Sequence, residues 1–411
     1  MNELLQINLF GDIFFYKFKI TARALTDFCL PKYIGSTLRG GFGKVFKKIS
    51  CPIKKFDCKD CFIAESCPYA NVFSNPTKIK DLTFLNQNSN TPHPYILDLE
   101  FNKNKFKNYY KAGDNLEFSL IIVGEAKKYL PYIVYCFIEL GKIGIGKDKG
   151  KYEILSIEND GLKIYDIGSK ELKLENFEKF DFVKVLNNLS INNKKLYEEF
   201  FLDLKENELK RMGLNLDNYN YLAFNKNKDK KNISHINLNS NNNINKYNIR
   251  NSNKTDNPNN PKILLTISFL TPTRIKYNGK YINFIDFKIL ITNLIRRLFL
   301  LNILFCQTVD KNKSYNNMNS INFYSIFQDY FQEAENIKVD DINLFWYDWE
   351  RYSSKQKTTM KLGGFIGRVS FCGYKDEFKK YIVPLVLGEQ LHIGKGTAFG
   401  LGKYEIENVK L

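Results

Sequence analysis

A loop rich in glycine and lysine occurs twice in this chain, at residues 141–150 and 388–402. Each copy leads into the same strand-like sequence, Gly-Lys-Tyr-Glu-Ile. An apolar segment with helical spacing precedes each copy, at Tyr129–Leu140 and Phe378–Leu387. Chance similarity is the alternative in a chain rich in lysine and isoleucine. The shared order of helix, loop and strand indicates two halves built on one plan.

The rest of each half repeats that plan. Apolar periodicity predicts strands, a helix and further strands in the first half, then the same order in the second. The predicted segments are 14–20, Tyr33–Ile49, Tyr95–Leu99 and Glu117–Val123, followed by Leu265–Phe269, Ile285–Phe305 and Phe365–Phe371. Strand–helix–strand used twice per half is the split βαβ pattern. The sequence therefore predicts an α+β fold of two tandem ferredoxin-like domains.

A tract of low complexity separates the halves. Residues 225–260 contain 15 Asn among 36 residues, with few large apolar groups. A segment of this composition buries too little apolar surface to offset the entropy lost when the chain becomes ordered. The tract is therefore predicted to be a disordered linker or insertion. The expected domains are then 1–224 and 261–411. Four glycines weaken the predicted helix Tyr33–Ile49, which suggests that another backbone approaches it closely.

The formal net charge of +17 points to an acidic partner. Nucleic acid is the first candidate and an anionic membrane surface the second, although a coding bias toward lysine accounts for part of the charge. The N-terminus lacks the pattern of a signal peptide. The most apolar helix carries Arg296 and Arg297 in its middle and is expected to be buried, not to cross a membrane. We therefore expect a cytoplasmic protein without a membrane partner.

Four cysteines lie close together in the first half. Cys51, Cys58, Cys61 and Cys67 include one CxxC pair, and four thiolates suffice to bind a structural Zn²⁺. The alternative is four ordinary thiols. No open coordination position is implied, so no cofactor is expected for catalysis.

Only three histidines are present, which narrows the search for a general base. His235 lies in the Asn-rich tract, and His93, in a Pro-flanked loop, is expected at the surface. His392 lies beside the second glycine loop and three residues before Lys395. We predict His392 and Lys395 as catalytic residues; the alternative is that His392 only orders the loop.

A phosphate-binding role is predicted for the second loop and for nearby arginines. The candidate RNA contacts are Arg39, Arg274, Gly394, Lys395, Gly396, Gly400, Gly402 and Lys403. Trp346 and Trp349 are candidates for stacking on bases, with core packing the alternative. Motifs of metal-dependent nucleases are lacking, so cleavage of nucleic acid would favour RNA, whose 2′-hydroxyl can attack the neighbouring phosphate.

These motifs resemble a known family. The run 391–404, with 269–274, Arg296-Arg297 and 360–367, resembles the RAMP superfamily of CRISPR-associated endoribonucleases that process precursor CRISPR RNA. Residues 38–43 with the cysteines resemble a cysteine-bearing branch of it. The resemblance implies tandem RAMP-type domains, with a small cysteine-rich insertion in the first.

The resemblance also implies a function. Metal-independent cleavage of CRISPR repeat RNA is expected, leaving a 5′-hydroxyl and a 2′,3′-cyclic phosphate. The expected partners are repeat RNA or crRNA, and other CRISPR effector subunits are further candidates. The alternative is a noncatalytic RAMP subunit that binds and carries crRNA. Many family members place the catalytic histidine in the first domain, where this chain offers only His93.

Overall fold

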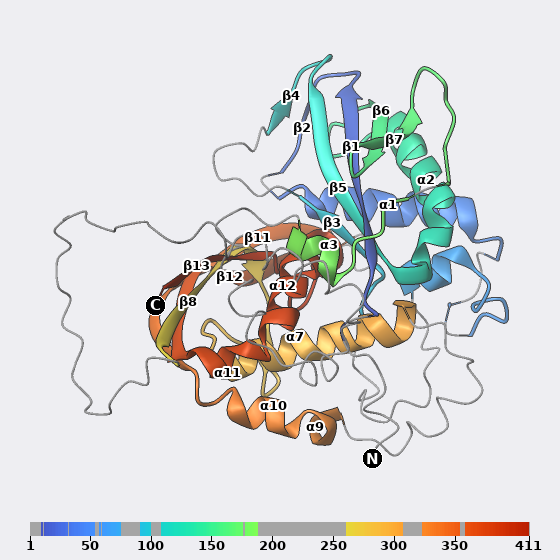
Figure 1. Cartoon of the computed structure of the whole chain (residues 1–411). Coiled ribbons are helices and arrows are strands. Elements are labelled where there is room, and N and C mark those ends of the chain that lie inside the picture. Colours follow the sequence, from blue (N-terminus) through green and yellow to red (C-terminus); the bar gives the residue numbers. More distant parts are fainter. Residues whose placement is uncertain are drawn as a thin grey trace, which may run out of the picture.

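The computed structural model describes residues 10–187 and 260–410, apart from short gaps at 11, 32, 54–56, 59, 75–90, 100–107, 176, 307–322 and 354–357. The Asn-rich tract, except for Asn260, and the helix expected near 192–212 lie outside the described residues. Two domains, each with its own main sheet, lie against one another (Figure 1).

The first domain is a five-stranded antiparallel sheet with the order β3-β5-β1-β6-β7. In chain order its main elements are β1 (Phe15–Ala24), α1 (Gly35–Ser50), β3 (Tyr95–Asp98), β5 (Asn115–Val123), α2 (Leu130–Ile143), β6 (Tyr152–Asn159) and β7 (Leu162–Asp166). Without the edge strand β7, the chain order and sheet order are those of a ferredoxin-like domain.

The second domain repeats the arrangement with the sheet order β11-β12-β8-β13. Its main elements are β8 (Lys262–Thr273), α7 (Phe287–Leu301), β11 (Lys338–Ser353), β12 (Thr358–Tyr374), α12 (Ile382–Leu391) and β13 (Tyr404–Lys410). The predicted α+β fold with two ferredoxin-like domains is therefore confirmed. Both glycine loops occupy the same place, between the second long helix and the last shared strand.

Shorter elements complete the described chain. They are β2 (Phe28–Cys29), η2 (Ala70–Ser74), β4 (Tyr109–Tyr110), η3 (Gly124–Tyr129), α3 (Phe182–Asn187), β9 (Lys276–Tyr277), β10 (Lys280–Tyr281), η5 (Asn302–Cys306), α9 (Phe323–Ile326), α10 (Gln328–Glu333), α11 (Lys375–Lys379) and η6 (Thr397–Phe399). The 16-residue strand β11 was not anticipated from the sequence.

Side chains on the two faces of the first sheet pack into two separate cores. Tyr16 and Phe18 point to the face covered by α1 and α2. Phe15, Ile96 and Ile121 point to the opposite face and join the core of the second domain. Both faces are buried in β3 and at the end of β5, whereas β1 alternates buried and exposed side chains toward its end.

The long apolar helix lies inside the second domain. Phe287–Cys306 is long and apolar enough to cross a membrane by length and composition alone. However, 72% of its most apolar stretch is buried within the protein. Its Leu294 and Leu298 are fully buried in the core that it shares with the sheet. It is a core helix, as expected.

Candidate functional site

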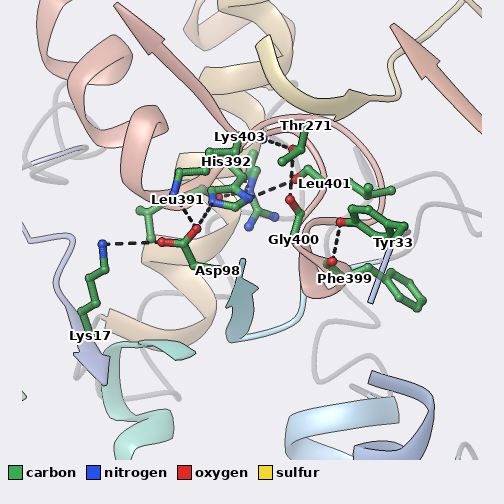
Figure 2. A network of polar contacts seen from close by, with 11 residues as sticks. Lys17, Tyr33, Asp98, Thr271, Leu391, His392, Phe399, Gly400, Leu401 and Lys403 are labelled. Atoms are coloured by element: carbon green, nitrogen blue, oxygen red, sulfur yellow. Dashed lines mark hydrogen bonds and ion pairs between the residues drawn. The ribbon is translucent and has the colours of Figure 1, made fainter. Parts of the chain in front are cut away.

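A buried carboxylate joins the two domains beside the second glycine loop. Asp98, at the end of β3, accepts a hydrogen bond from the ammonium of Lys403 at 2.7 Å (Figure 2). Lys17 Nζ lies 3.5 Å from its other oxygen. Burial alone would raise the pKa of Asp98, but His392 and the two lysines reverse this effect and hold the pKa well below its usual range. Asp98 is therefore ionised and links both domains.

His392 belongs to this buried network. It is 1% exposed, and its Nε2 lies 3.7 Å from Asp98 Oδ1. Its Nδ1 lies 3.1 Å from the carbonyl oxygen of Leu401, and its own carbonyl accepts from Arg297 Nε. Burial lowers the pKa of His392, and Asp98 only partly opposes this shift. An imidazole enclosed between a carbonyl and a carboxylate fits the alternative role, in which His392 orders the loop; the catalytic role stays a prediction.

The glycine loop is held tightly by the protein itself. The amides of Lys395, Gly400 and Gly402 donate to the carbonyls of Arg274, Thr397 and Pro272. A Cβ on Gly400, whose φ is +86°, would lie 2.4 Å from the carbonyl oxygen of Leu97 in the first domain. These three amides are therefore occupied within the protein, and phosphate binding by the loop stays a prediction. The glycines allow the loop to pack against β3.

The prediction of a close backbone approach to α1 is confirmed at one position. A Cβ on Gly35 would lie 2.1 Å from the carbonyl oxygen of Phe399 in the glycine loop. Tyr33, just before the helix, donates its hydroxyl to the same oxygen at 2.6 Å (Figure 2). The start of α1 and η6 are therefore in direct contact across the domain boundary.

Arg39 of α1 points into this boundary. Its guanidinium lies 4.9 Å from the ring centre of Phe399 and 5.1 Å from that of Phe73. The charges of Arg39 and Arg297 both act on His93, and that of Arg39 acts on Tyr95. Five buried side-chain atoms in this part of the protein lack a direct hydrogen-bond partner among the described residues: Ser36 Oγ, Arg39 Nε, His93 Nδ1, Tyr95 OH and Arg297 Nη2. We call these five residues the interdomain polar cluster.

His93 was expected at the surface, but it packs into this cluster. Its ring lies 5.7 Å from that of Tyr95 and 6.4 Å from that of Phe73. Burial, followed by the charges of Arg39 and Arg297, lowers the pKa of His93 to about 4. Arg297 is buried as well, and desolvation lowers the pKa of its guanidinium. Buried polar groups usually have hydrogen-bond partners. Five buried polar atoms without one therefore indicate a site for a polar ligand.

Two of the predicted RNA contacts lie together at the surface. Lys395 is exposed, and its amide donates to the carbonyl of Arg274 at 2.8 Å. Partial desolvation of its ammonium and the nearby charge of Arg296 lower the pKa of Lys395. The ammonium of Lys403, by contrast, is committed to Asp98. Of Lys395 and Arg274, Lys395 is thus the more accessible, since Arg274 is partly buried and donates from Nη1 to the carbonyl of Gly363 at 2.9 Å.

A family model described as CRISPR-associated endoribonuclease Cas6 matches residues 267–404, from β8 to the start of β13. The matched residues make up most of the C-terminal domain, so the similarity to this family lies in that domain. A second family model, described only as an N-terminal domain, matches residues 13–177.

A relative of this chain is an uncharacterized protein of Archaeoglobus fulgidus, 28% identical over 158 residues. That match covers 38% of this chain and half of the relative's length. Similar solved structures include Thermus thermophilus Cas6 (8% identical, TM-score 0.42, 96% of this chain and 99% of that chain). A partial Cas6-RT-Cas1–Cas2 complex is 10% identical with a TM-score of 0.46, over 96% of this chain and 46% of that chain.

The four clustered cysteines of the first domain do not assemble as the predicted zinc site. Among the described residues, no group of three or more His, Cys, Asp or Glu side chains is placed to hold a metal ion. Cys51 Sγ and Cys67 Sγ instead point to the carbonyl oxygens of Ile53 and Ser50. The described geometry does not support bound zinc and fits four free thiols.

The two tryptophans differ in environment. Trp349 is 8% exposed and packs with its ring centre 5.1 Å from that of Tyr33. Trp346 is 40% exposed on the edge strand β11. Core packing therefore holds for one tryptophan, and the other stays a candidate for base stacking.

Proposed function

We propose that this chain is an endoribonuclease that cleaves CRISPR repeat RNA within a precursor transcript, at the boundary between its two domains. The observation that carries the proposal is the interdomain polar cluster, which lies beside the glycine loop of the domain that matches the Cas6 family model. It combines two guanidinium groups, an imidazole and two hydroxyls, each with one buried polar atom that has no direct hydrogen-bond partner among the described residues. Arg297 also donates from Nε to the carbonyls of Leu391 and His392. A phosphodiester is the ligand that matches these groups.

In this proposal the RNA supplies its own nucleophile. The 2′-hydroxyl gives its proton to a base as its oxygen attacks the adjacent phosphorus, the bond from phosphorus to the 5′-oxygen breaks, and the leaving oxygen takes up a proton from an acid. The products are a 2′,3′-cyclic phosphate and a 5′-hydroxyl. Arg39 and Arg297 would balance the charge that develops on the phosphoryl oxygens, so that the step needs no metal ion.

His93 is the candidate that this geometry favours for proton transfer. It is neutral at pH 7 because its pKa is lowered to about 4. Two of the three causes of that shift are the charges of Arg39 and Arg297. A bound phosphate anion would offset those charges and raise the pKa of His93 toward the range in which general bases work best.

His392 and Lys395 keep different roles in the proposal. His392 would position the loop, because it is enclosed and in contact with Asp98. Lys395 would bind RNA phosphate at the surface beside Arg274. If His392 transfers a proton, the loop must open to admit the phosphate.

The second candidate function is a noncatalytic RAMP subunit that binds and carries crRNA. The observation in its favour is that burial lowers the pKa of both described histidines. In either function, repeat RNA is the proposed partner, and other CRISPR proteins are candidate partners.

The deciding experiment incubates the purified protein with repeat RNA in EDTA and analyses the end groups of any product. The proposal expects one cut that leaves a cyclic phosphate. The matched control is the same RNA with a 2′-deoxy nucleotide at the cut, which should bind equally and stay intact. Tight binding of the unmodified RNA without a cut would favour the carrier function.

A further inference from the structure

The short hairpin formed by β9 and β10 projects from the second domain between β8 and α7. Lys276 pairs with Tyr281 and Tyr277 with Lys280 around an Asn-Gly turn, with φ +49° at Asn278 and +79° at Gly279. Both turn residues thus have the positive φ of the tight turns that fit hairpins. All four strand residues are exposed.

The base of this hairpin is anchored firmly. Ile275 and Ile282 are 0% and 7% exposed and belong to the core of the second domain. The amide of Ile282 donates to the carbonyl of Ile275 at 3.1 Å. The exposed tip is therefore held on a rigid support, and its aromatic rings are not part of any core.

The surface of the hairpin is basic and aromatic. Residues 274–285 include three basic side chains and no acidic one. Tyr277 is 48% exposed, Tyr281 43% and Phe284 46%. Because directly paired residues share a face, Tyr281 with Lys276 lies on one face of the hairpin and Tyr277 with Lys280 on the other.

Only the Tyr281 face is linked to the glycine loop by the contacts described here. The guanidinium of Arg274 lies 4.3 Å from the ring centre of Tyr281, and Lys276 Nζ lies 5.3 Å from it. Arg274 in turn accepts the amide of Lys395 on its carbonyl. Tyr281 and Lys276 are also near enough to affect the titration of the Lys395 ammonium. The Tyr281 ring, the Arg274 guanidinium and the ammonium groups of Lys276 and Lys395 thus lie close together on one surface.

We propose that the Tyr281 face of this hairpin binds single-stranded RNA next to the cleavage site, with one base stacked on Tyr281 and the flanking phosphates held by Lys276, Arg274 and Lys395. The inference rests on the proposed function and concerns the part of the same RNA that lies beyond the glycine loop. Aromatic rings beside cations are the usual platform for unpaired bases. The flexible Lys276 side chain can leave the ring for a phosphate when a base arrives.

The test uses the two tyrosines of the hairpin as a matched pair, because they have similar exposure and lie on opposite faces. A short fluorescent oligouridylate and the repeat RNA are the probes, with affinity read by anisotropy. Tyr281→Ala should weaken oligouridylate binding roughly tenfold. Tyr277→Ala should change it by less than about twofold, and Tyr281→Phe should bind like the wild type because the ring is kept.

The outcomes separate this inference from the function on which it rests. Equal effects of Tyr281→Ala and Tyr277→Ala, or none for either, would overturn the stacking surface while repeat-RNA cleavage by the wild type still upheld the endoribonuclease. A wild type that neither binds nor cuts either RNA would overturn both. Thermal unfolding of all variants should match the wild type, since the substituted side chains are exposed.

Discussion

The carboxylate of Asp98 and the ammonium of Lys403, 2.7 Å apart, connect the end of β3 in the first domain to the end of the glycine loop in the second. The Asp98 side chain is 6% exposed, so water screens this pair poorly. The pair holds the loop against the first domain at the position where the proposed site needs both domains.

Replacing Asp98 by Asn should lower the free energy of unfolding by about 3 kcal/mol, because Lys403 and Lys17 lose the carboxylate that balances them. Denaturant unfolding measures this change. Glu117→Gln is the control, since its pair with Lys19 is 3.3 Å long and about half exposed on both sides. It should cost less than about 1 kcal/mol. Similar losses in both variants would contradict a role for the buried link.

Substitutions of the two described histidines should differ in their effects on cleavage and on stability. His93→Ala should lower the rate of repeat-RNA cleavage by about 100-fold or more with little change in binding, because a proton-transfer group is lost. His392→Ala should chiefly lower the melting temperature, because it removes contacts to Asp98 and Leu401. Single-turnover cleavage, anisotropy and thermal unfolding are the measurements. A folded His392→Ala variant that binds RNA and does not cut would instead support the catalytic prediction for His392.

Glu389 should make stability depend on pH. Burial, only partly offset by the amide of Ile406, raises the pKa of Glu389 to about 8. Because the carboxyl has a higher pKa in the folded than in the unfolded state, ionisation favours the unfolded state. The free energy of unfolding therefore falls as pH rises from about 4.5 to 8. Glu389→Gln keeps an acceptor for Ile406 and removes this loss.

The variant should therefore be more stable than the wild type by on the order of 3 to 4 kcal/mol at pH 8, and by less than about 1 kcal/mol at pH 5. Denaturant unfolding at both pH values checks the sign. A constant difference across the two conditions would show that Glu389 does not titrate in this range.

Gly400→Ala should disturb the domain boundary specifically. Its Cβ would meet the carbonyl of Leu97 at 2.4 Å, whereas a Cβ on Gly113, at a similar φ of +94°, would meet nothing within 4 Å. Both variants carry the strain of a positive φ, about 1 kcal/mol, but only Gly400→Ala adds the clash. We expect a markedly lower melting temperature and weaker cleavage for Gly400→Ala than for Gly113→Ala. Equal melting temperatures would count against the close packing.

The duplicated architecture could be read from the sequence because its signals are local. The apolar spacing of the helix before each loop and the repeated Gly-Lys-Tyr-Glu-Ile were enough to place α2, β6, α12 and β13. The strand β11 was missed because it lies at an edge, where Ile342, Phe345 and Trp346 are exposed. An exposed edge strand lacks the alternation that reveals strands with one buried face.

The site could be predicted only in part. His392 stood out because of the glycine loop, but its partner Asp98 comes from the other domain, and no local pattern indicates that pairing. His93 lies in a Pro-flanked segment typical of surface loops. Its enclosure comes from Phe73 and Tyr95, and its lowered pKa from Arg39 and Arg297 as well. Such environments arise from the tertiary fold.

The double burial of the first sheet has a consequence for biosynthesis. Phe15, Ile96, Ile121 and Val123 are all 0% exposed, and the core that covers them is built largely by the second half of the chain. A ribosome makes the first half earlier, so these side chains emerge before their cover exists. The nascent protein therefore exposes an apolar sheet face for as long as the second half takes to be synthesised, and this face can associate with other apolar surfaces during that interval.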